Sequence, residues 1–334
     1  MLGSIWDFNV LKKRRESEVK KAKERIQYLW DNLDDGIPVI IGYSGGKDST
    51  LLLELTLEVS RENDFNHEVI AHYSNTGYDS KVKVAHIEQE AIELNKLKNT
   101  RFCMTHPQKN LTILSLICGR GYPAPSVFNR YCAHAVKLEA SDRFEREIAN
   151  THGGALILVG ERKEESLRRH NRLNKEGAPD ALVRVRQRPF PIYKCSPIAD
   201  VKTDEVWSFF DSIEQTVWGT PISKLKEFYS NKRGRDGCWI CTVASEKGFA
   251  DQELATGKIR MFLRQLNDDP TKRCICSTPK QKEKLESGIA AGKFTQEARR
   301  EFYNFVKEQE RLSGETFISA EEDAFIHDCW NKGL

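Results

Sequence analysis

No stretch of the 334-residue chain approaches the roughly 20 consecutive apolar residues that a membrane-spanning helix needs. Residues 1–13 contain aromatic and charged side chains but no apolar core of the kind that secretion signals have. Nor does one sign of charge dominate, because 52 Lys and Arg residues face 49 Asp and Glu residues. These absences predict a cytoplasmic protein with no membrane partner, in which any charged ligand is bound by a local cluster.

The composition is that of a folded globular chain, with 39% hydrophobic and 30% charged residues. In a reducing cytoplasm the nine cysteines are not expected to form a disulfide framework. We expect some of them to be packed thiols and others to bind a metal or to do chemistry.

Short β-branched runs alternate with amphipathic segments through the first half of the chain. Strands are expected at residues 39–43, 67–73, 101–105 and 155–160, and helices at 50–59, 81–97, 111–118 and 136–149. This alternation predicts an α/β fold, a mostly parallel twisted sheet with helices on both faces.

The sequence suggests three regions. A charged N-terminal helix is expected within residues 1–35, a nucleotide-binding domain over 36–220, and a helical, cysteine-containing region over 221–334. Residues 161–188 hold many Arg and Lys residues together with Gly177 and Pro179, so we expect a mobile basic loop there.

A glycine-rich loop joins the first expected strand to its helix. It reads Ser44-Gly45-Gly46-Lys47-Asp48-Ser49, preceded by Tyr43. Glycines permit a close backbone approach, and the amides at the start of the helix point toward an anion. The Walker A spacing is absent, so the loop predicts a different kind of ATP site, in which Lys47 contacts phosphate and Asp48 holds Mg²⁺.

The loop resembles the PP-loop of the ATP pyrophosphatase family, which also includes relatives of the sulfonucleotide (PAPS) reductases. Further blocks resemble the sulfurtransferase subunit of bacterial DNA phosphorothioation systems (DndC and SspD type). They are Gly121-Tyr122-Pro123-Ala124-Pro125, Asn129-Arg130-Tyr131-Cys132, Gly160-Glu161-Arg162-Lys163-Glu164-Glu165-Ser166, Ser196-Pro197-Ile198-Ala199-Asp200, Asp204-Glu205-Val206-Trp207 and Gly237-Cys238-Trp239-Ile240-Cys241-Thr242. The resemblance implies an adenine nucleotide alpha hydrolase-like fold and splitting of ATP to AMP and pyrophosphate.

Two other strand ends are expected to contribute to the ATP site, because ligands bind beyond the carboxyl ends of parallel strands. The strand expected to end at Gly160 contributes that glycine to ATP binding, and position and resemblance assign the following Arg162 and Arg168 to catalysis through phosphate. After the second strand, Asn75 and Thr76 are expected to form a wall of the site, although a simple turn is an alternative explanation of the same residues. Basic residues further along, Arg184, Arg186 and Arg188, could follow a nucleic-acid backbone.

The cysteine pattern predicts a metal or cluster site. The C-x-x-C pair Cys238 and Cys241 can grip one metal or one cluster. The resemblance implies a 4Fe-4S cluster that also uses Cys132, and we infer Cys195 as the fourth ligand from its position. Cys274 and Cys276 are alternative ligands, for zinc or a cluster, and a redox dithiol also remains open. Three other cysteines, Cys103, Cys118 and Cys329, are expected to be packed thiols.

The resemblance implies sulfur incorporation into DNA. The enzyme would adenylate a backbone phosphate and expel pyrophosphate, and sulfur from a cysteine desulfurase would then displace AMP, with other DNA-modification proteins presenting the DNA. The alternatives are a sulfonucleotide (PAPS or APS) reductase, a tRNA thiolase, or a non-catalytic ATP-sensing DNA-binding subunit. Against the reductase, Cys329 lacks the Glu-Cys-Gly-x-His setting of such enzymes.

Overall fold

The computed structural model describes residues 17–127, 129–177, 182–186, 189–230, 238–243, 251, 253–275, 278–288 and 290–333. Arg188, Gly237 and Cys276, and the expected start of the first helix near Leu11, lie outside these residues. The chain divides into two compact units. The first comprises residues 1–73, 85–104 and 143–231, and the second comprises residues 74–84, 105–142 and 232–334. A single boundary near Thr220 therefore does not describe the division, because two earlier segments belong to the second unit.

The first unit is built on a six-stranded sheet in the order β3-β2-β1-β4-β6-β5. The strands are β1 (Val39–Gly42), β2 (Val69–Ser74), β3 (Thr100–Thr105), β4 (Ala155–Val159), β5 (Val183–Arg186) and β6 (Ile192–Cys195). Five strands are parallel, and β5 pairs antiparallel with β6 at one edge. The predicted α/β class with a mostly parallel sheet is confirmed.

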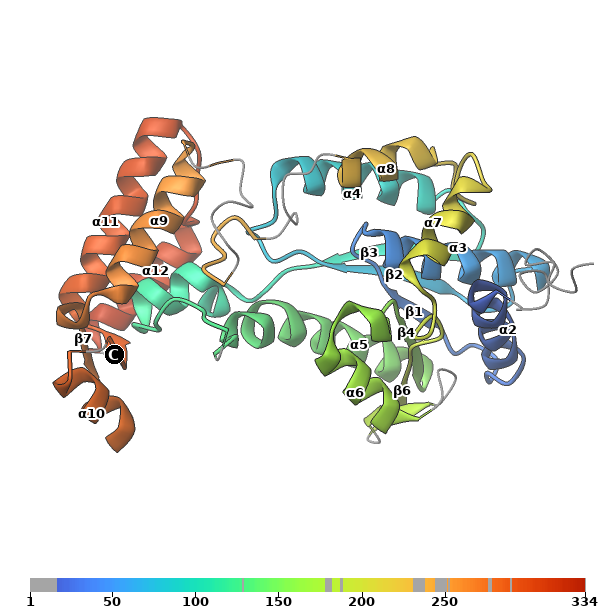
Figure 1. The fold of residues 1–334 in the computed structure, drawn as a ribbon, viewed down its shortest axis with the longest axis horizontal. Helices are drawn as coiled ribbons and strands as arrows, with labels where there is room; N and C mark the ends of the chain where they lie inside the picture. Colours follow the sequence, from blue (N-terminus) through green and yellow to red (C-terminus); the bar gives the residue numbers. More distant parts are fainter. Residues whose placement is uncertain are drawn as a thin grey trace, which may run out of the picture. The chain divides into compact units, whose positions relative to one another are not determined.

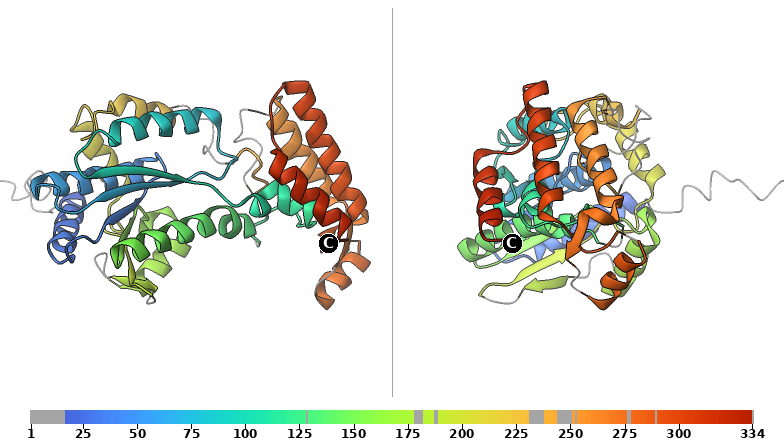
Figure 2. Two further views of the ribbon diagram at one scale, coloured as in Figure 1. Left: turned by 180° about the vertical axis from the view of Figure 1, so that it is seen from behind. Right: turned by 90° about the vertical axis from the view of Figure 1, so that its left-hand side faces the viewer.

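Apolar side chains cover both faces of this sheet. Ile40, Ile70 and Ile157 pack in one cluster with Ile148 and Ala149 of α5. Their neighbours in the strands belong to a second, larger cluster, which also contains side chains of α2, α3, α7 and α8. Strands covered on both faces are continuously apolar, which is why the runs at β1 and β4 were recognisable in the sequence. Figures 1 and 2 show α3 and α4 on one face and α5 on the other.

Four helices of the first half of the chain agree with expected ones, with shifted ends: α2 (Glu18–Asp31), α3 (Lys47–Glu62), α4 (Lys81–Leu94) and α5 (Glu139–His152). The first unit also contains α6 (Leu167–Glu176) and α7 (Thr203–Asp211), which were not predicted, and α8 (Ile222–Ser230), which lies in the region expected to be helical. The mobile basic loop expected over 161–188 was wrong, because α6 and β5 lie within it. Ser166 caps α6 by accepting a hydrogen bond from the Arg169 amide, and Leu173 is buried, so the segment has its own anchors.

The second unit is mainly helical around its own apolar core. Its elements are η1 (Lys109–Leu111), η2 (Ser115–Gly119), η3 (Ala133–Leu138), α9 (Ala255–Asp268), η6 (Pro270–Lys272), β7 (Arg273–Ile275), α10 (Pro279–Glu286), β8 (Lys293–Phe294), α11 (Gln296–Ser313) and α12 (Ala320–Asn331). Both views of the fold show α9, α11 and α12 side by side (Figures 1 and 2). Leu263, Phe302 and Ile326 from these helices share one buried cluster, so the expected helical C-terminal region is present. No helix in the described part of the chain is long and apolar enough to span a membrane.

A buried carboxyl group on α3 makes stability depend on pH. Burial raises the pKa of Glu54 from 4.5 to about 7, although the Val217 amide donates to both of its oxygens. The folded protein therefore holds a proton that the unfolded chain releases, and the stability from this group is lost as pH rises through about 7. We expect Glu54→Gln to flatten the pH dependence of urea unfolding between pH 5 and 8, and the exposed-site control Glu24→Gln to leave it unchanged. A slope retained in Glu54→Gln would assign the pH dependence to another group.

Candidate nucleotide site

The glycine-rich loop lies where the chain order of the sheet reverses. From β1 the chain adds β2 and then β3 on one side, and later adds β4 on the other side of β1. Gly42, the last residue of β1, pairs with Val159 at the end of β4, so the segments after these two strands leave the sheet next to each other. Ligands of open α/β sheets bind at such a switch point, beyond the carboxyl ends of the strands.

The loop itself is tightly built. Gly45 has a φ of +71°, and a Cβ atom there would lie 2.6 Å from Cδ1 of Ile87 on α4. The hydroxyls of Ser44 and Ser49 are 3.0 Å apart, and the Ser49 hydroxyl also accepts the Ser44 amide and donates to the Gly46 carbonyl. The N-cap residue of α3 is Gly46, which has no side chain to cap the helix, so an external anion can bind at this end.

Gly160 lets the segment after β4 approach the loop. A Cβ atom at Gly160 would lie 3.0 Å from the Asp48 carbonyl oxygen and 3.1 Å from the Ser49 amide nitrogen. The backbone after β4 therefore packs directly against the first turn of α3, and the role of Gly160 in ATP binding stays a prediction.

Asp48 is held between two cations. Lys47 Nζ lies 2.8 Å from one carboxylate oxygen of Asp48, and Arg162 Nε lies 2.8 Å from the other. Asp48 and Lys47 each expose 15% of their side chains, whereas Arg162 exposes 2%. Solvent and ligands therefore reach Lys47 and Asp48 but not the guanidinium group.

Arg162 donates to protein acceptors on several sides, rather than facing the phosphate position that the sequence suggested. Besides Asp48, its guanidinium group donates to Glu164 Oε2 at 3.1 Å, to the Val201 carbonyl at 3.0 Å and to Thr203 Oγ1 at 3.1 Å. This arrangement makes Arg162 a positioning residue for Asp48. Arg168 is exposed on the first turn of α6.

The side chain of Tyr43 points into the core. Tyr43 is 3% exposed, and its hydroxyl donates to the buried carboxylate of Glu90 at 3.1 Å. Trp218 Nε1 and the Thr220 hydroxyl donate to the same carboxylate. Tyr43 therefore ties the start of the loop to α4, and only its backbone is placed to contact a nucleotide.

The structure adds a residue that sequence reasoning missed, Tyr229 on α8. Its hydroxyl oxygen accepts a hydrogen bond from the Lys47 amide at 2.9 Å. The Lys47 ammonium lies 5.8 Å from the centre of the Tyr229 ring. No motif marks this tyrosine, because 182 residues separate it from the loop that it contacts.

The Asn75-Thr76-Gly77 segment belongs to the second unit, where it forms a turn. Asn75 Oδ1 accepts the Gly77 amide at 2.8 Å, and the Thr76 hydroxyl donates to Asp79 Oδ2 at 3.0 Å. The Thr76 hydroxyl also lies 3.4 Å from Cys238 Sγ. These hydrogen bonds support the interpretation of the segment as a turn. The role of Asn75 and Thr76 as a wall of the ATP site stays a prediction.

Three of the predicted cluster ligands share the second unit. Burial raises the pKa of Cys132, and the neighbouring Cys241 raises it further. Burial likewise raises the pKa of Cys238 to about 11, with Asp79 and Cys241 adding to the shift and the Thr76 hydroxyl opposing it. A bound metal ion would reverse this by favouring the thiolates. Among the described residues, however, no group of three or more His, Cys, Asp or Glu side chains is arranged to hold a metal ion.

The remaining cysteines are placed differently. Cys195 is 2% exposed in the main apolar cluster of the first unit. Cys274 lies in β7, and Cys276 lies outside the described residues. The expected packed thiols Cys118 and Cys329 are 0% and 1% exposed, which confirms both, and Cys103 is half-buried.

The sequence blocks that carry the resemblance assemble in two groups. In the first unit, the Lys163 amide donates to the Ala199 carbonyl, and the Lys163 ammonium pairs with Asp200 at 2.7 Å. In the second unit, the Thr242 hydroxyl donates to the Pro125 carbonyl at 2.6 Å, and the Tyr131 hydroxyl donates to the Pro123 carbonyl at 2.8 Å. Segments far apart in the sequence thus contact one another within each unit.

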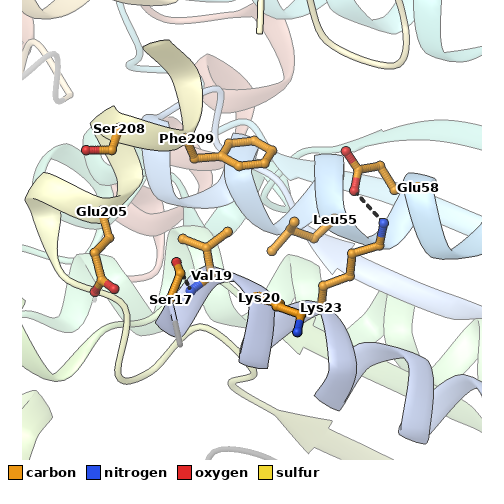
Figure 3. Close-up of a pocket in the computed structure, with 9 residues that line it drawn as sticks. All are labelled: Ser17, Val19, Lys20, Lys23, Leu55, Glu58, Glu205, Ser208 and Phe209. Atoms are coloured by element: carbon orange, nitrogen blue, oxygen red, sulfur yellow. Dashed lines mark hydrogen bonds and ion pairs between the residues drawn. The ribbon is translucent and has the colours of Figure 1, made fainter. Parts of the chain in front are cut away.

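An open groove of about 670 Å³ lies elsewhere in the first unit, lined by α2, α3 and α7 (Figure 3). Its floor includes Leu55 and Phe209, and an ion pair of 2.9 Å joins Lys23 to Glu58 at its edge. Leu55 lies more than two helical turns after Lys47, the first residue of α3, so this groove is separate from the loop end of that helix.

The sequence matches a protein-family model, and the fold is similar to that of solved structures. The family model of the phosphoadenosine phosphosulfate reductase domain matches residues 38–244. No curated protein matches the sequence significantly. Similar solved structures include a phosphoadenylyl-sulfate reductase from Candida auris in a phosphate complex (13% identity, 73% of this chain and 99% of that chain, TM-score 0.42). Another is the U34-tRNA thiolase NcsA from Methanococcus maripaludis with its [4Fe-4S] cluster (14% identity, 90% and 80%, TM-score 0.42).

Proposed function

The chain belongs to the phosphoadenosine phosphosulfate reductase domain family, and we propose that it is an ATP pyrophosphatase that activates a DNA backbone phosphate for sulfur incorporation. The family model spans the glycine-rich loop and the C-x-x-C pair. DNA as the acceptor rests on the resemblance of the sequence blocks to the DNA phosphorothioation subunits.

The observation that carries the proposal is the loop at the switch point. Gly45, Gly46 and the start of α3, where the N-cap glycine has no capping side chain, are suited to bind phosphate oxygens through backbone amides. Lys47 adds a positive charge at the opening, and Ser44 and Ser49 brace the loop. Such a site stabilises the charge that develops on pyrophosphate as it leaves.

Different residues of the loop have different roles in the proposed adenylation. A DNA phosphate oxygen attacks the α-phosphorus of ATP, the bond to the bridging oxygen breaks, and pyrophosphate departs with the bonding electrons. Lys47 and the loop amides meet the growing charge on the departing group. Asp48, held by Arg162, fixes the Lys47 ammonium at the opening.

Mg²⁺ is the ion that Asp48 was expected to hold. Both of its carboxylate oxygens already accept hydrogen bonds from Lys47 or Arg162 in this structure. This arrangement does not present an open carboxylate for a divalent ion, so the proposal assigns Mg²⁺ no step.

The sulfur step uses the adenylated phosphate. A persulfide, formed by a cysteine desulfurase acting as partner, attacks the DNA phosphorus and expels AMP. A second thiolate then attacks the sulfur of the former persulfide cysteine, which forms a disulfide and leaves the outer sulfur on DNA as a phosphorothioate. Other modification proteins present the DNA.

A 4Fe-4S cluster remains part of the proposal without a step of its own. The thiols of Cys132, Cys238 and Cys241 fit such a group by chemistry, since cluster iron takes thiolate ligands. The described residues do not complete its ligand set, and Cys195 lies in the apolar core of the first unit.

The test follows labelled ATP with the anaerobically purified full chain. We expect AMP and pyrophosphate to form, DNA but not tRNA to stimulate the reaction, and Asp48→Ala to abolish it, while the exposed-site control Asp35→Ala keeps it. With a cysteine desulfurase and cysteine added, digested DNA should yield sulfur-containing dinucleotides.

Stimulation of ATP turnover by tRNA instead of DNA would make the chain a tRNA thiolase. Nucleotide-dependent retention of DNA without turnover of ATP would make it a non-catalytic sensor.

The second candidate is a sulfonucleotide reductase, favoured by the description of the matching family. Such an enzyme needs an accessible cysteine to attack sulfur. Cys329 is 1% exposed within α12, and burial raises its pKa, so it is not available as that nucleophile. Release of sulfite from a sulfated adenosine nucleotide, with no AMP formed from ATP, would establish the reductase instead.

A further inference from the structure

We infer that Tyr229 occupies a phosphate position of the nucleotide site and leaves it when ATP or pyrophosphate binds. The inference rests on the proposed use of the glycine-rich loop. It assigns a role in ligand exchange to a residue outside every motif in the sequence.

The geometry places a neutral oxygen where an anionic one is expected. The Tyr229 hydroxyl oxygen lies 2.9 Å from the Lys47 amide nitrogen, the first amide of α3. The same oxygen would lie 3.2 Å from a Cβ atom on Gly46, so it sits directly against the glycine that opens the loop to a ligand. A phosphate oxygen bound by the start of α3 needs this amide, and one N–H group makes one good hydrogen bond.

The surroundings of Tyr229 hold it there without burying it. Its ring packs edge-on against Trp207 with the ring centres 5.1 Å apart, and the Lys47 ammonium lies 5.8 Å from the ring centre. Ile222 and Leu225 anchor the earlier turns of α8 in the core. Tyr229 itself is 45% exposed, so its side chain can turn away without disturbing the packing of the helix.

Replacement of the Tyr229 hydroxyl by an anionic oxygen at the Lys47 amide is energetically favourable. A phosphate oxygen accepts a charge-assisted hydrogen bond, which is roughly twice as strong as the neutral one that the hydroxyl accepts. ATP therefore displaces the tyrosine, but the lost contact weakens ATP binding. After turnover, the hydroxyl competes with pyrophosphate for the same amide and so promotes release of the product.

The test compares binding of ATP and inorganic pyrophosphate to the full chain by calorimetry. Tyr229→Phe removes only the competing oxygen, so we expect both ligands to bind about two- to tenfold tighter, the range that one net hydrogen bond supplies. Inhibition of AMP formation by pyrophosphate should strengthen by the same factor. The matched control is Tyr28→Phe, at a 61% exposed tyrosine on α2, which should bind as the wild type does.

The outcomes separate this inference from the proposed function. If the wild-type chain binds neither ATP nor pyrophosphate, the nucleotide site itself is wrong. If the wild type binds both and Tyr229→Phe binds them equally or more weakly, only the exchange is overturned, because the hydroxyl is then neutral or helpful to the ligand. Tyr229→Ala, which also removes the ring, should bind at least as tightly as Tyr229→Phe. A change seen in Tyr229→Ala but not in Tyr229→Phe would place the effect in the ring and contradict the inference.

Discussion

Replacing Arg162 with methionine is expected to lower the formation of AMP at least about a hundredfold and to destabilise the protein by about 3–5 kcal/mol. The guanidinium group is 2% exposed and joins Asp48 to Glu164, Thr203 and the Val201 carbonyl. Methionine fills a similar volume but cannot donate a hydrogen bond. The buried bond to the Val201 carbonyl is lost, and Asp48 keeps only Lys47 as its cationic partner. Asp48 would then lose its fixed position beside Lys47.

Arg162→Lys separates charge from geometry. Lysine keeps the positive charge but cannot donate in the planar fork that reaches four acceptors, so we expect most of the activity to stay lost. Urea unfolding and the rate of AMP formation measure the two effects, with exposed Arg61→Met as the control. An Arg162→Met protein of normal stability that binds ATP normally and turns it over at the wild-type rate would show that Asp48 does not depend on this arginine.

Replacing Gly45 with alanine is expected to weaken ATP binding at least about tenfold and to cost about 2–5 kcal/mol of stability, from two separate causes. The φ of +71° makes any side chain unfavourable, and the new Cβ atom would lie 2.6 Å from Cδ1 of Ile87. The loop must therefore move, and its amides lose the arrangement that binds phosphate.

Gly153 provides a matched control for the Gly45 prediction. Its φ is +81°, but no atom lies within 4 Å of a Cβ built there, so Gly153→Ala carries the backbone strain without the collision. We expect Gly153→Ala to bind ATP normally. Adding Ile87→Val to Gly45→Ala removes the colliding methyl group and should restore part of the ATP affinity. If the double variant binds no better than Gly45→Ala, the collision is not the cause of the loss.

Local sequence patterns were enough to predict those elements whose defining residues lie close together in the sequence. The β1 and β4 strands are buried on both faces, which forces continuous apolar runs, and both were predicted within one residue of each end. The loop at residues 44–49 was placed at a strand end for the same reason. The strand β6, which pairs with β4, was not predicted, because it has only four residues and places Tyr193 and Lys194 between its two buried ends.

The prediction of a mobile loop over residues 161–188 was wrong because it relied on the charge of the segment. The Arg and Lys residues there suggested a solvated loop, but several of them form ion pairs within or near α6, such as Arg172 with Glu161 at 2.6 Å and with Glu176 at 2.7 Å. Arg162 differs most from its prediction, since a buried arginine with protein acceptors has the same sequence signature as an exposed phosphate ligand. Burial is a property of the packed structure, and a charge pattern does not contain it.

The sequence by itself determined the α/β class, the position of the glycine-rich loop and the cysteines available for a metal site, because these depend on periodicity and on residues within one short segment. Only the tertiary structure decided which side chains meet. It joined Arg162 to Asp48, Tyr43 to Glu90 and Tyr229 to the Lys47 amide, and it put Cys195 in the core of one unit and Cys132, Cys238 and Cys241 in the other. These contacts join residues 47 to 182 positions apart, and such pairings follow from the packing of whole elements rather than from any local pattern.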